Sequence, residues 1–413
     1  MPKTTPFHDR LEPLNKTGIW KHWAGYLIAP RFQYSTTAEY YAIRNAVSLL
    51  DTSPLFKYRI SGPEAIRFLQ AVMIRDVAQC KTGTAQYTCW CDPQGFVLQD
   101  GVILRITEDE FWLTSGEPSL RYFRALARQF GMEQVQFDDI TTDYGILALQ
   151  GPHAYHVLSQ LTSEVADLGY FELTQTTLNG CRVMISRTGF TGDLGYEIWV
   201  EAGQAISVWD SLIQAGEGYN ITPIGTTALK MARVEAGLLL LDVDFQSSRF
   251  AWVDAQRETP IELGWGWMLR NLQQDTRKFV GREAIEEQRS SKTNRWTTVG
   301  LSVDWHDYER VHLEAGIMPA KHDEYYETTM SIYRRGEPQW NYAGYATSFV
   351  YSSLLKKPIA IAKLPNDLAR PGTEVDLEIS VIRKPVNVLC TVQRMPFYNP
   401  PRKTLSPTEG SSS

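Results

Sequence analysis

Residues 186–200 read SRTGFTGDLGYEIWV, with glycines at positions 189, 192 and 195 directly before a run of aromatic and β-branched residues. A dinucleotide-binding loop needs the spacing G-x-G-x-x-G and a following helix, whereas this stretch has G-x-x-G-x-x-G and continues as YEIWV. A P-loop is excluded as well, because no Gly-Lys-Ser/Thr follows. The stretch is therefore predicted to be a glycine-rich turn between the antiparallel strands CRVMISR (181–187) and YEIWV (196–200).

Two carboxylates lie inside predicted strands. Glu197 belongs to YEIWV, where it lies either on a solvent-facing edge or beside a specific donor. Asp100 belongs to FVLQDGVILRI (96–106), and strand alternation places it on the same apolar face as Leu98 and Val102. A carboxylate on an apolar face costs stability unless it has a partner, and its pKa is perturbed. Asp100 is therefore interpreted either as the partner of a buried arginine or as a catalytic or ligand-orienting group.

The composition is that of an ordinary globular protein. The chain has 413 residues, of which 43% are hydrophobic and 21% charged, and its formal net charge is −6. No long basic run occurs, which excludes nucleic acid and membrane surfaces as partners, and no stretch approaches the roughly 18 apolar residues of a membrane span. No signal peptide is predicted, and five scattered cysteines indicate reduced thiols and a cytoplasmic protein. No metal site is predicted, because Cys89 and Cys91 have no second pair at zinc spacing, and His153 and His156 have no acidic partner.

One β-then-α unit occurs twice in the N-terminal half. SGPEAIRFL and QGPHAYHVL share the pattern GP-x-A-x-x-x-L, and both follow a predicted strand. A helix is predicted over residues 38–50, and a hairpin over residues 85–106 turns at Asp-Pro-Gln-Gly. From about residue 295, short strands separated by turn residues predict a separate small β domain or barrel.

Together these segments resemble the aminomethyltransferase superfamily, which contains the glycine-cleavage T-protein and the tetrahydrofolate-dependent demethylases of dimethylsulfoniopropionate and of lignin-derived aromatics. The resemblance covers about residues 35–395 and rests on SGPEAIRFL, TGTAQYTCWCDPQGFVLQDGVI, LALQGPHA, SRTGFTGDLGYEI, ARVEAG, KFVGREA and GYATSFVYSSLLKKPIAIA in this order. It implies an α+β fold of three subdomains in a cloverleaf-like arrangement around a central hole that holds folate. The implied parts are an N-terminal extension (1–34), a folate-binding domain of two αβ subdomains (35–290), a C-terminal β-barrel (295–396) and a disordered tail (397–413).

The resemblance also implies the site residues. Asp100 matches the family aspartate beside the reactive nitrogens of tetrahydrofolate, and it is the implied catalytic residue. Glu197 matches the glutamate that binds the pterin, whose adjacent N–H donors one carboxylate accepts as a charge-assisted pair. The other implied cofactor-binding positions are Tyr87, Trp267, Ser115 (asparagine in the T-protein) and Phe190 (tyrosine in the T-protein).

Two departures from the T-protein move the predicted function toward the demethylases. Gln99 stands where the T-protein usually has an aspartate, and Leu229 stands where it has an arginine. The second departure argues against a lipoyl carrier protein as partner, without excluding it. The predicted reaction is therefore transfer of a methyl group from a small N-, S- or O-methylated substrate to N5 of tetrahydrofolate.

Two other functions stay open. One is an aminomethyltransferase that forms 5,10-methylene-tetrahydrofolate. The other is a non-catalytic folate-binding regulatory protein, which is disfavoured because that branch has a cysteine in K-G-C-Y-x-G-Q where this chain has RTGFTGDLG.

The N-terminal segment is rich in aromatic residues, whose faces attract a cationic methyl donor. We therefore predict a substrate pocket that contains Trp20, Trp23, Tyr26, Phe32 and Tyr34. Ordinary packing is the alternative interpretation of these residues.

Overall fold

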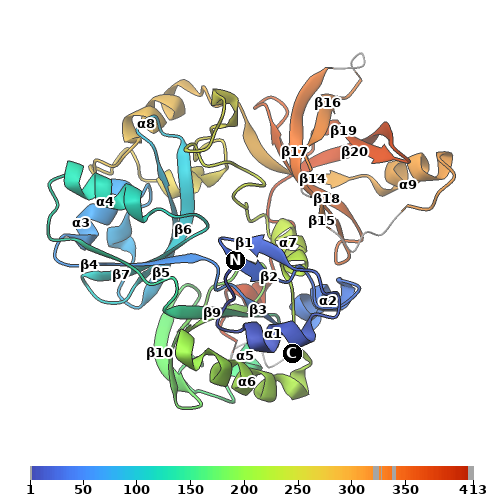
Figure 1. Cartoon of the computed structure of the whole chain (residues 1–413). Coiled ribbons are helices and arrows are strands. Elements are labelled where there is room, and N and C mark those ends of the chain that lie inside the picture. Colours follow the sequence, from blue (N-terminus) through green and yellow to red (C-terminus); the bar gives the residue numbers. More distant parts are fainter. Residues whose placement is uncertain (1, 320–324, 327, 337–340, 408–413) are drawn as a thin grey trace.

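The structure is a computed structural model that describes residues 2–319, 325–326, 328–336 and 341–407. Figure 1 shows three lobes, each built around its own β-sheet. Helices and sheets are mixed throughout, so the predicted α+β fold of three subdomains is confirmed.

The first lobe contains a five-stranded antiparallel sheet in the order β5-β6-β7-β4-β8. Two helices cover one face of this sheet, because their apolar residues, such as Phe68 and Phe123, pack in one core with Trp90 and Ile103 of the strands. The elements of this lobe are β4 (Phe56–Ser61), α3 (Ala65–Val72), β5 (Thr84–Cys91), β6 (Val97–Arg105), β7 (Glu110–Ser115), α4 (Leu120–Gln129), β8 (Gln136–Asp139) and α8 (Arg282–Ser291).

The second lobe contains a six-stranded sheet in the order β10-β11-β12-β9-β3-β13, in which only the β13–β3 pair is parallel among the described strands. Its outer face packs against α5 and α6, which bring Val157 and Trp209 to the core that contains Tyr196 and Ile198. The elements are β3 (Val47–Asp51), β9 (Tyr144–Gln150), α5 (Ala154–Leu158), β10 (Leu173–Leu178), β11 (Cys181–Ser186), β12 (Gly195–Glu201), α6 (Ala205–Gly216) and β13 (Ile221–Pro223).

The third lobe is a barrel. The strand order β17-β16-β19-β20-β14-β18 closes on itself because β17 also pairs with β18, and β15 (Tyr325–Tyr326) adds to β17. The predicted C-terminal barrel is therefore confirmed. Its elements are β14 (Thr297–Val303), α9 (Trp305–Glu314), β16 (Met330–Arg334), β17 (Tyr342–Ser352), β18 (Lys357–Leu364), β19 (Glu374–Val381) and β20 (Lys384–Gln393).

The three lobes meet in one core, which we call the central cluster. Helices α2 (Thr37–Asn45) and α7 (Thr226–Glu235) contribute to it between the second lobe and the barrel (Figure 1). Its buried members include Cys89 from the first lobe, Ala148 from the second lobe and Val350 from the barrel. Burial of these apolar side chains away from water fixes the lobes against one another.

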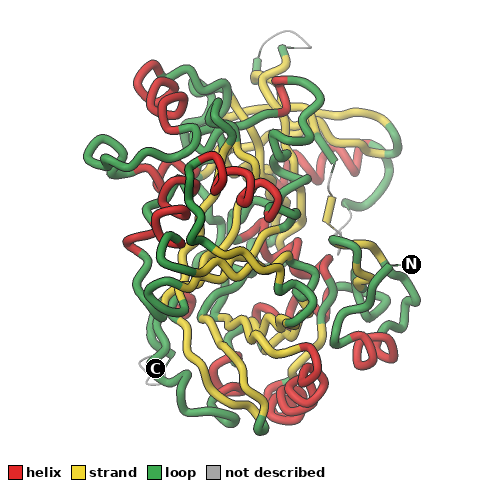
Figure 2. The backbone as a smooth tube through the Cα atoms, turned by 60° about the vertical axis from the view of Figure 1, so that its left-hand side comes forward, coloured by secondary structure: helices red, strands yellow, loops and turns green. Residues whose placement is uncertain are grey.

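Figure 2 shows the backbone from a second direction, with the strands of the sheets in yellow and the helices that pack on them in red. In the N-terminal segment, α1 (His8–Leu11) packs on the second lobe, whose core includes Leu11 and the fully buried Phe7. The hairpin of β1 (Lys21–Trp23) and β2 (Tyr26–Ile28) follows α1.

The C-terminal segment differs from its prediction as a disordered tail. Residues 397–407 are described and contain a short 3₁₀ helix at Pro401–Lys403. The segment is ordered because its polar groups have buried partners: Arg402 donates to Asp193, and Arg187 donates to the backbone oxygens of residues 402 and 403. The rest of the predicted tail, 408–413, lies outside the described residues.

No helix in the described ranges is long and apolar enough to cross a membrane. The same ranges contain no group of three or more His, Cys, Asp or Glu side chains that could hold a metal ion. All five cysteines are buried and free.

Candidate active site

The first two sheets turn one face toward each other. Ala85 and Leu104 from the first sheet pack in one cluster with Met184 and Trp199 from the second. Asp100 is two residues along β6 from Val102, and Glu197 is two residues along β12 from Trp199, so both carboxylates project from these facing sides.

Their neighbours on the adjacent strands support the same placement. Cys89 lies directly opposite Asp100, Ala148 lies directly opposite Glu197, and both belong to the central cluster. The two carboxylates therefore border the region where the three lobes meet.

Asp100 is half-buried and accepts a hydrogen bond on Oδ2 from the hydroxyl of Tyr87 at 2.7 Å. Burial raises the pKa of Asp100 to about 6, although the bond from Tyr87 acts in the opposite direction. No arginine or lysine among the described residues lies within ion-pair distance of this carboxylate. The alternative of a buried arginine partner is therefore wrong, and the carboxylate is available to a ligand.

The prediction that Leu98, Asp100 and Val102 share one face of β6 is correct for Asp100 and Val102 and wrong for Leu98. A β-bulge at Trp90/Cys91 shifts the register between β5 and β6, so Leu98 packs in the first-lobe core on the other side of the sheet. Val97 takes its place and packs in the central cluster.

Glu197 is half-buried and is held by a specific donor rather than exposed on an edge. The hydroxyl of Thr188 donates to its Oε2 at 2.5 Å, and Thr188 also bonds to the hydroxyl of Ser186 at 2.7 Å. Burial raises the pKa of Glu197, and the bond from Thr188 opposes that shift. One carboxylate oxygen is thus fixed, whereas Oε1 has no protein donor among the described residues.

Aromatic rings surround the Asp100 end of this region. Tyr87 and Trp267 lie almost parallel, with ring centroids 6.5 Å apart and an interplanar angle of 23°, and Trp265 meets Tyr87 edge-on. Trp267 is 40% exposed, so part of this aromatic cluster is accessible from solvent. Such a surface suits a planar heteroaromatic ligand.

The described structure shows no hydrogen bond to the carboxylates of Asp100 or Glu197 from three other residues considered in the sequence, Phe190, Ser115 and Gln99. Phe190 is half-buried in the loop between β11 and β12. Ser115 is buried at the end of β7, and its hydroxyl donates to the backbone oxygen of Glu117 at 2.6 Å. Gln99 is buried and faces away from Asp100, because adjacent strand residues point to opposite sides.

The predicted aromatic substrate pocket is not assembled. Phe32 is buried in the second-lobe core, Trp20 packs beside that core against His8, and Tyr34 is 76% exposed. Trp23 and Tyr26 lie opposite each other in the β1–β2 hairpin, where Tyr26 contacts Lys3. Ordinary packing is therefore the better interpretation for these residues.

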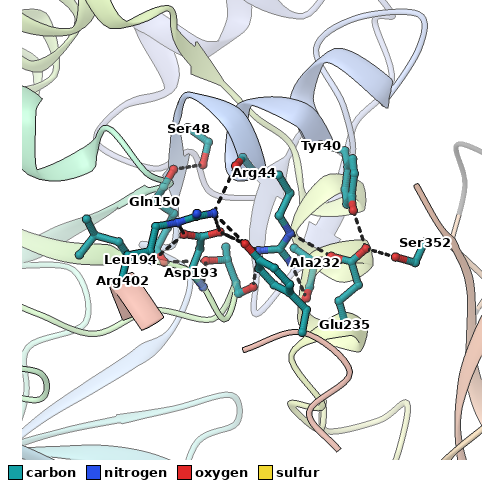
Figure 3. A network of polar contacts seen from close by, with 12 residues as sticks. Tyr40, Arg44, Ser48, Gln150, Asp193, Leu194, Ala232, Glu235, Ser352 and Arg402 are labelled. Atoms are coloured by element: carbon teal, nitrogen blue, oxygen red, sulfur yellow. Dashed lines mark hydrogen bonds and ion pairs between the residues drawn. The ribbon is translucent and has the colours of Figure 1, made fainter. Parts of the chain in front are cut away.

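The loop that carries Thr188 is fixed by a buried polar network (Figure 3). Asp193 accepts hydrogen bonds from Arg402 at 2.6 and 2.9 Å, and Arg44 pairs with Glu235 of α7 at 2.7 Å and donates to the backbone oxygen of Thr191. Glu235 also accepts hydrogen bonds from the hydroxyls of Tyr40 in α2 and Ser352 in the barrel. The loop is therefore connected through this network to α2, α7, the barrel and the C-terminal segment.

Sequence reasoning missed Thr188, Arg75 and this network. Thr188 stands in the quoted stretch, but its bond to Glu197 depends on how the loop folds back. Arg75 directly follows the apolar run AVMI, and a charge beside such a run is a sequence signal for a partly buried cation. The sequence does not show, however, that the Arg75 guanidinium lies over the Trp267 ring. The network joins residues about 200 positions apart and has no local signature.

Comparisons with known proteins agree with this architecture. Residues 8–271 match the family described as the GCVT N-terminal domain, and residues 314–399 match the glycine cleavage T-protein C-terminal barrel domain. The crystal structure of glycine cleavage system aminomethyltransferase T from Bartonella henselae superposes with a TM-score of 0.79 at 22% sequence identity, covering 97% of this chain and 99% of that one. At this sequence identity the match shows a shared fold only.

Curated relatives align over nearly the whole chain. An aminomethyltransferase from Saccharopolyspora erythraea is 28% identical over 399 residues, which are 96% of this chain and 98% of the relative. One from Bacillus subtilis is 29% identical over 400 residues, with 96% and 99% covered. A trimethylamine-oxide aldolase from Ruegeria pomeroyi is 28% identical over 388 residues, which are 91% of this chain but 45% of that protein.

The sheet topology, the closed barrel and the match of residues 8–271 to the GCVT N-terminal domain agree with one another. This chain belongs to the aminomethyltransferase (glycine cleavage T-protein) family.

Proposed function

We propose that this protein is a tetrahydrofolate-dependent one-carbon transferase of the aminomethyltransferase type. The observation that carries the proposal is the pair of carboxylates, Asp100 and Glu197, on facing sheets, neither with an ion-pair partner among the described residues. End-to-end alignment with aminomethyltransferases supports aminomethyl transfer better than the methyl transfer that the sequence favoured.

The side chains present fit a folate. Glu197 has one oxygen fixed by Thr188 and the other free, so it is able to accept N–H donors from the amino-pyrimidone edge of a pterin. Tyr87 and Trp267 supply flat aromatic surface next to Asp100. Tetrahydrofolate, when bound, supplies the secondary amine nitrogens to which a one-carbon unit is attached.

Asp100 is proposed to hold and move a proton at those nitrogens. A base works best when its pKa lies near the operating pH, and burial brings the pKa of this carboxyl to about 6. Tyr87 fixes one oxygen of the carboxylate and leaves the other to the ligand. The surrounding lobes would limit the access of water to the reaction and would orient the donor toward the folate.

The donor in this proposal is an aminomethyl group on a lipoyl carrier protein. A second candidate, transfer from a free methylated amine, is favoured by one observation. Leu229 is a partly buried apolar residue packed on the central cluster, so the arginine expected there from the T-protein is replaced by a group without charge. An acidic carrier surface would lose an ion pair there, whereas a small neutral or cationic amine does not need one.

The deciding experiment offers both donors to the purified protein with tetrahydrofolate. One arm contains an aminomethyl-loaded lipoyl carrier protein, and the other contains trimethylamine oxide or dimethylglycine. We expect folate-dependent ammonia release and 5,10-methylene-tetrahydrofolate, identified by mass, in the first arm. The second candidate would instead be established by one-carbon transfer from a free amine with no ammonia release, detected as 5-methyl-tetrahydrofolate from dimethylglycine or as 5,10-methylene-tetrahydrofolate from trimethylamine oxide.

A further inference from the structure

Arg75 lies beside the candidate active site without an acidic partner. Its guanidinium carbon is 5.3 Å from the centroid of the Trp267 ring, and Nη1 donates to the backbone oxygen of Tyr87 at 3.2 Å. The side chain is half-buried, so its charge is partly removed from water. Within the described parts of the chain, no carboxylate lies within ion-pair distance of it, and it makes no other side-chain hydrogen bond.

Three other buried or half-buried arginines have acidic partners, whereas the buried Arg187, like Arg75, donates only to backbone oxygens among the described residues. Arg44 pairs with Glu235, Arg233 with Asp244 and Arg277 with Asp275, each through short contacts. A buried or half-buried guanidinium costs stability unless its charge is compensated. Most of the donor fork of Arg75 is free, and that fork matches the geometry of a carboxylate.

Four side chains form a continuous row from Arg75 to the candidate catalytic residue. Arg75 lies over Trp267, Trp267 stacks on Tyr87, and the hydroxyl of Tyr87 donates to Asp100. The row thus has a cation at one end, two aromatic rings in the middle and a carboxylate at the other end. A folate has the same succession of groups: reactive nitrogens, then an aromatic ring, then a glutamate.

We infer that Arg75 binds a carboxylate of the ligand that lies on Tyr87 and Trp267, and that this carboxylate belongs to the glutamate part of the folate. The inference rests on the proposed function. A carboxylated one-carbon donor carries the same chemical group, but a donor must lie at Asp100, at the opposite end of the row.

The test compares two ligands that differ only at this end. Binding of tetrahydrofolate and of tetrahydropteroate, which lacks the glutamate, is measured by calorimetry and by quenching of tryptophan fluorescence. The proteins are the wild type, Arg75→Ala, Arg75→Lys and the control Arg270→Ala, which removes an exposed cation at the C-terminal end of the 3₁₀ helix that contains Trp267. Thermal unfolding of each variant checks that it is folded.

We expect Arg75→Ala to weaken tetrahydrofolate binding by about 10- to 100-fold, because a charge-assisted pair is lost, and to leave tetrahydropteroate binding unchanged. Arg75→Lys should recover part of the loss, and Arg270→Ala should have little effect. Equal loss for both ligands, or no loss for either, would overturn the inference. Failure of the wild type to bind either ligand would contradict the proposed function itself, so the two failures are distinguishable.

Discussion

At the scale of single residues, Asp100 and Glu197 show how strands of ordinary sequence hold carboxylates that have no ion-pair partner among the described residues. Each carboxylate has one oxygen bonded to a hydroxyl and the other unused, and burial raises the pKa of both. Both groups therefore reduce the stability of the ligand-free protein, and in the proposed function they bind the ligand. Thr188 and Tyr87, the two donors, are what keep these carboxylates in place.

Asp100→Asn is expected to lower turnover by about 10²- to 10⁴-fold, because the proton acceptor is lost, and to leave folate binding largely intact. For the wild type, kcat/KM should fall below an apparent pKa of about 6 as Asp100 becomes protonated. A pH profile with single-turnover kinetics and a folate titration measures both. Full turnover in the asparagine variant would contradict the role given to Asp100.

The same substitution should raise stability. The pKa of Asp100 in the folded protein, about 6, exceeds that of an unfolded aspartate, so the folded state binds the proton more tightly between about pH 4 and pH 6. Relative to Asp100→Asn, wild-type stability should therefore fall as pH rises through this window, by roughly 1–3 kcal/mol in total. Urea unfolding of both proteins at pH 4.5 and pH 7 tests the sign.

Thr188 is expected to act through Glu197. Thr188→Val removes the donor but keeps the shape, and it should weaken folate binding by about tenfold, the equivalent of one hydrogen bond to a charged group. Thr188→Ser keeps the hydroxyl and should restore most of the affinity. A variant pair that binds folate equally well would show that the bond does not position Glu197.

At the scale of elements, the glycine-rich turn has a more specific cause than chain reversal. Gly192 has φ +72°, which a turn requires. Gly189 and Gly195 instead leave room for Gln150, since a Cβ at either position would lie 2.0 or 2.1 Å from Oε1 of that side chain. Gln150 is buried, and its amide donates to the backbone oxygens of Thr188 and Tyr196.

Gly195→Ala should therefore displace Gln150 and lower the free energy of unfolding by about 1–3 kcal/mol, the usual cost of overpacking. Folate affinity should fall as well, because Glu197 follows two residues later in β12. Gly203→Ala is the matched control, since a Cβ there meets nothing within 4 Å. Equal stability of the two variants would contradict this account of the turn.

The predicted helices and strands are correct where they depend on a local sequence pattern. They are wrong where the structure depends on pairing with another strand. The two β-then-α units, the hairpin and the barrel follow from alternation and turn residues. The helix predicted over 38–50 ends at Asn45, however, and Val47–Asp51 forms the inner strand β3 between β9 and β13, because its residues are buried on both sides of the sheet. The bulge at Trp90/Cys91 has no signal in the sequence and depends on pairing with β6.

At the scale of the whole molecule, the carboxylates of the site were predictable and their surroundings were not. Asp100 and Glu197 stand out as charges in apolar strands. Arg402 and Asp193 stand 209 positions apart, and no periodicity links them. The same holds for Arg75 and Trp267, which meet only because the chain leaves the first lobe at β8 and returns to it after α7.

Arg402→Ala is expected to lower the free energy of unfolding by about 1–3 kcal/mol, because the fully buried carboxylate of Asp193 loses its strongest partner while Arg44 remains nearby. Arg10→Ala, which breaks an exposed pair with Asp210, is the control and should have little effect on stability, because solvent screens that pair. Denaturant midpoints compare the two variants. A smaller loss for Arg402→Ala than for the control would show that the C-terminal segment does not stabilise the loop.

The contact between Arg402 and Asp193 has a consequence for biosynthesis. A ribosome produces the loop at residues 188–194 long before it produces residue 402, so Asp193 stays without this cation until the barrel has also been made. The loop beside Glu197 is then completed last, when the barrel brings the returning segment onto the second lobe. We expect nascent chains released before residue 402 to contain folded lobes but to bind folate weakly.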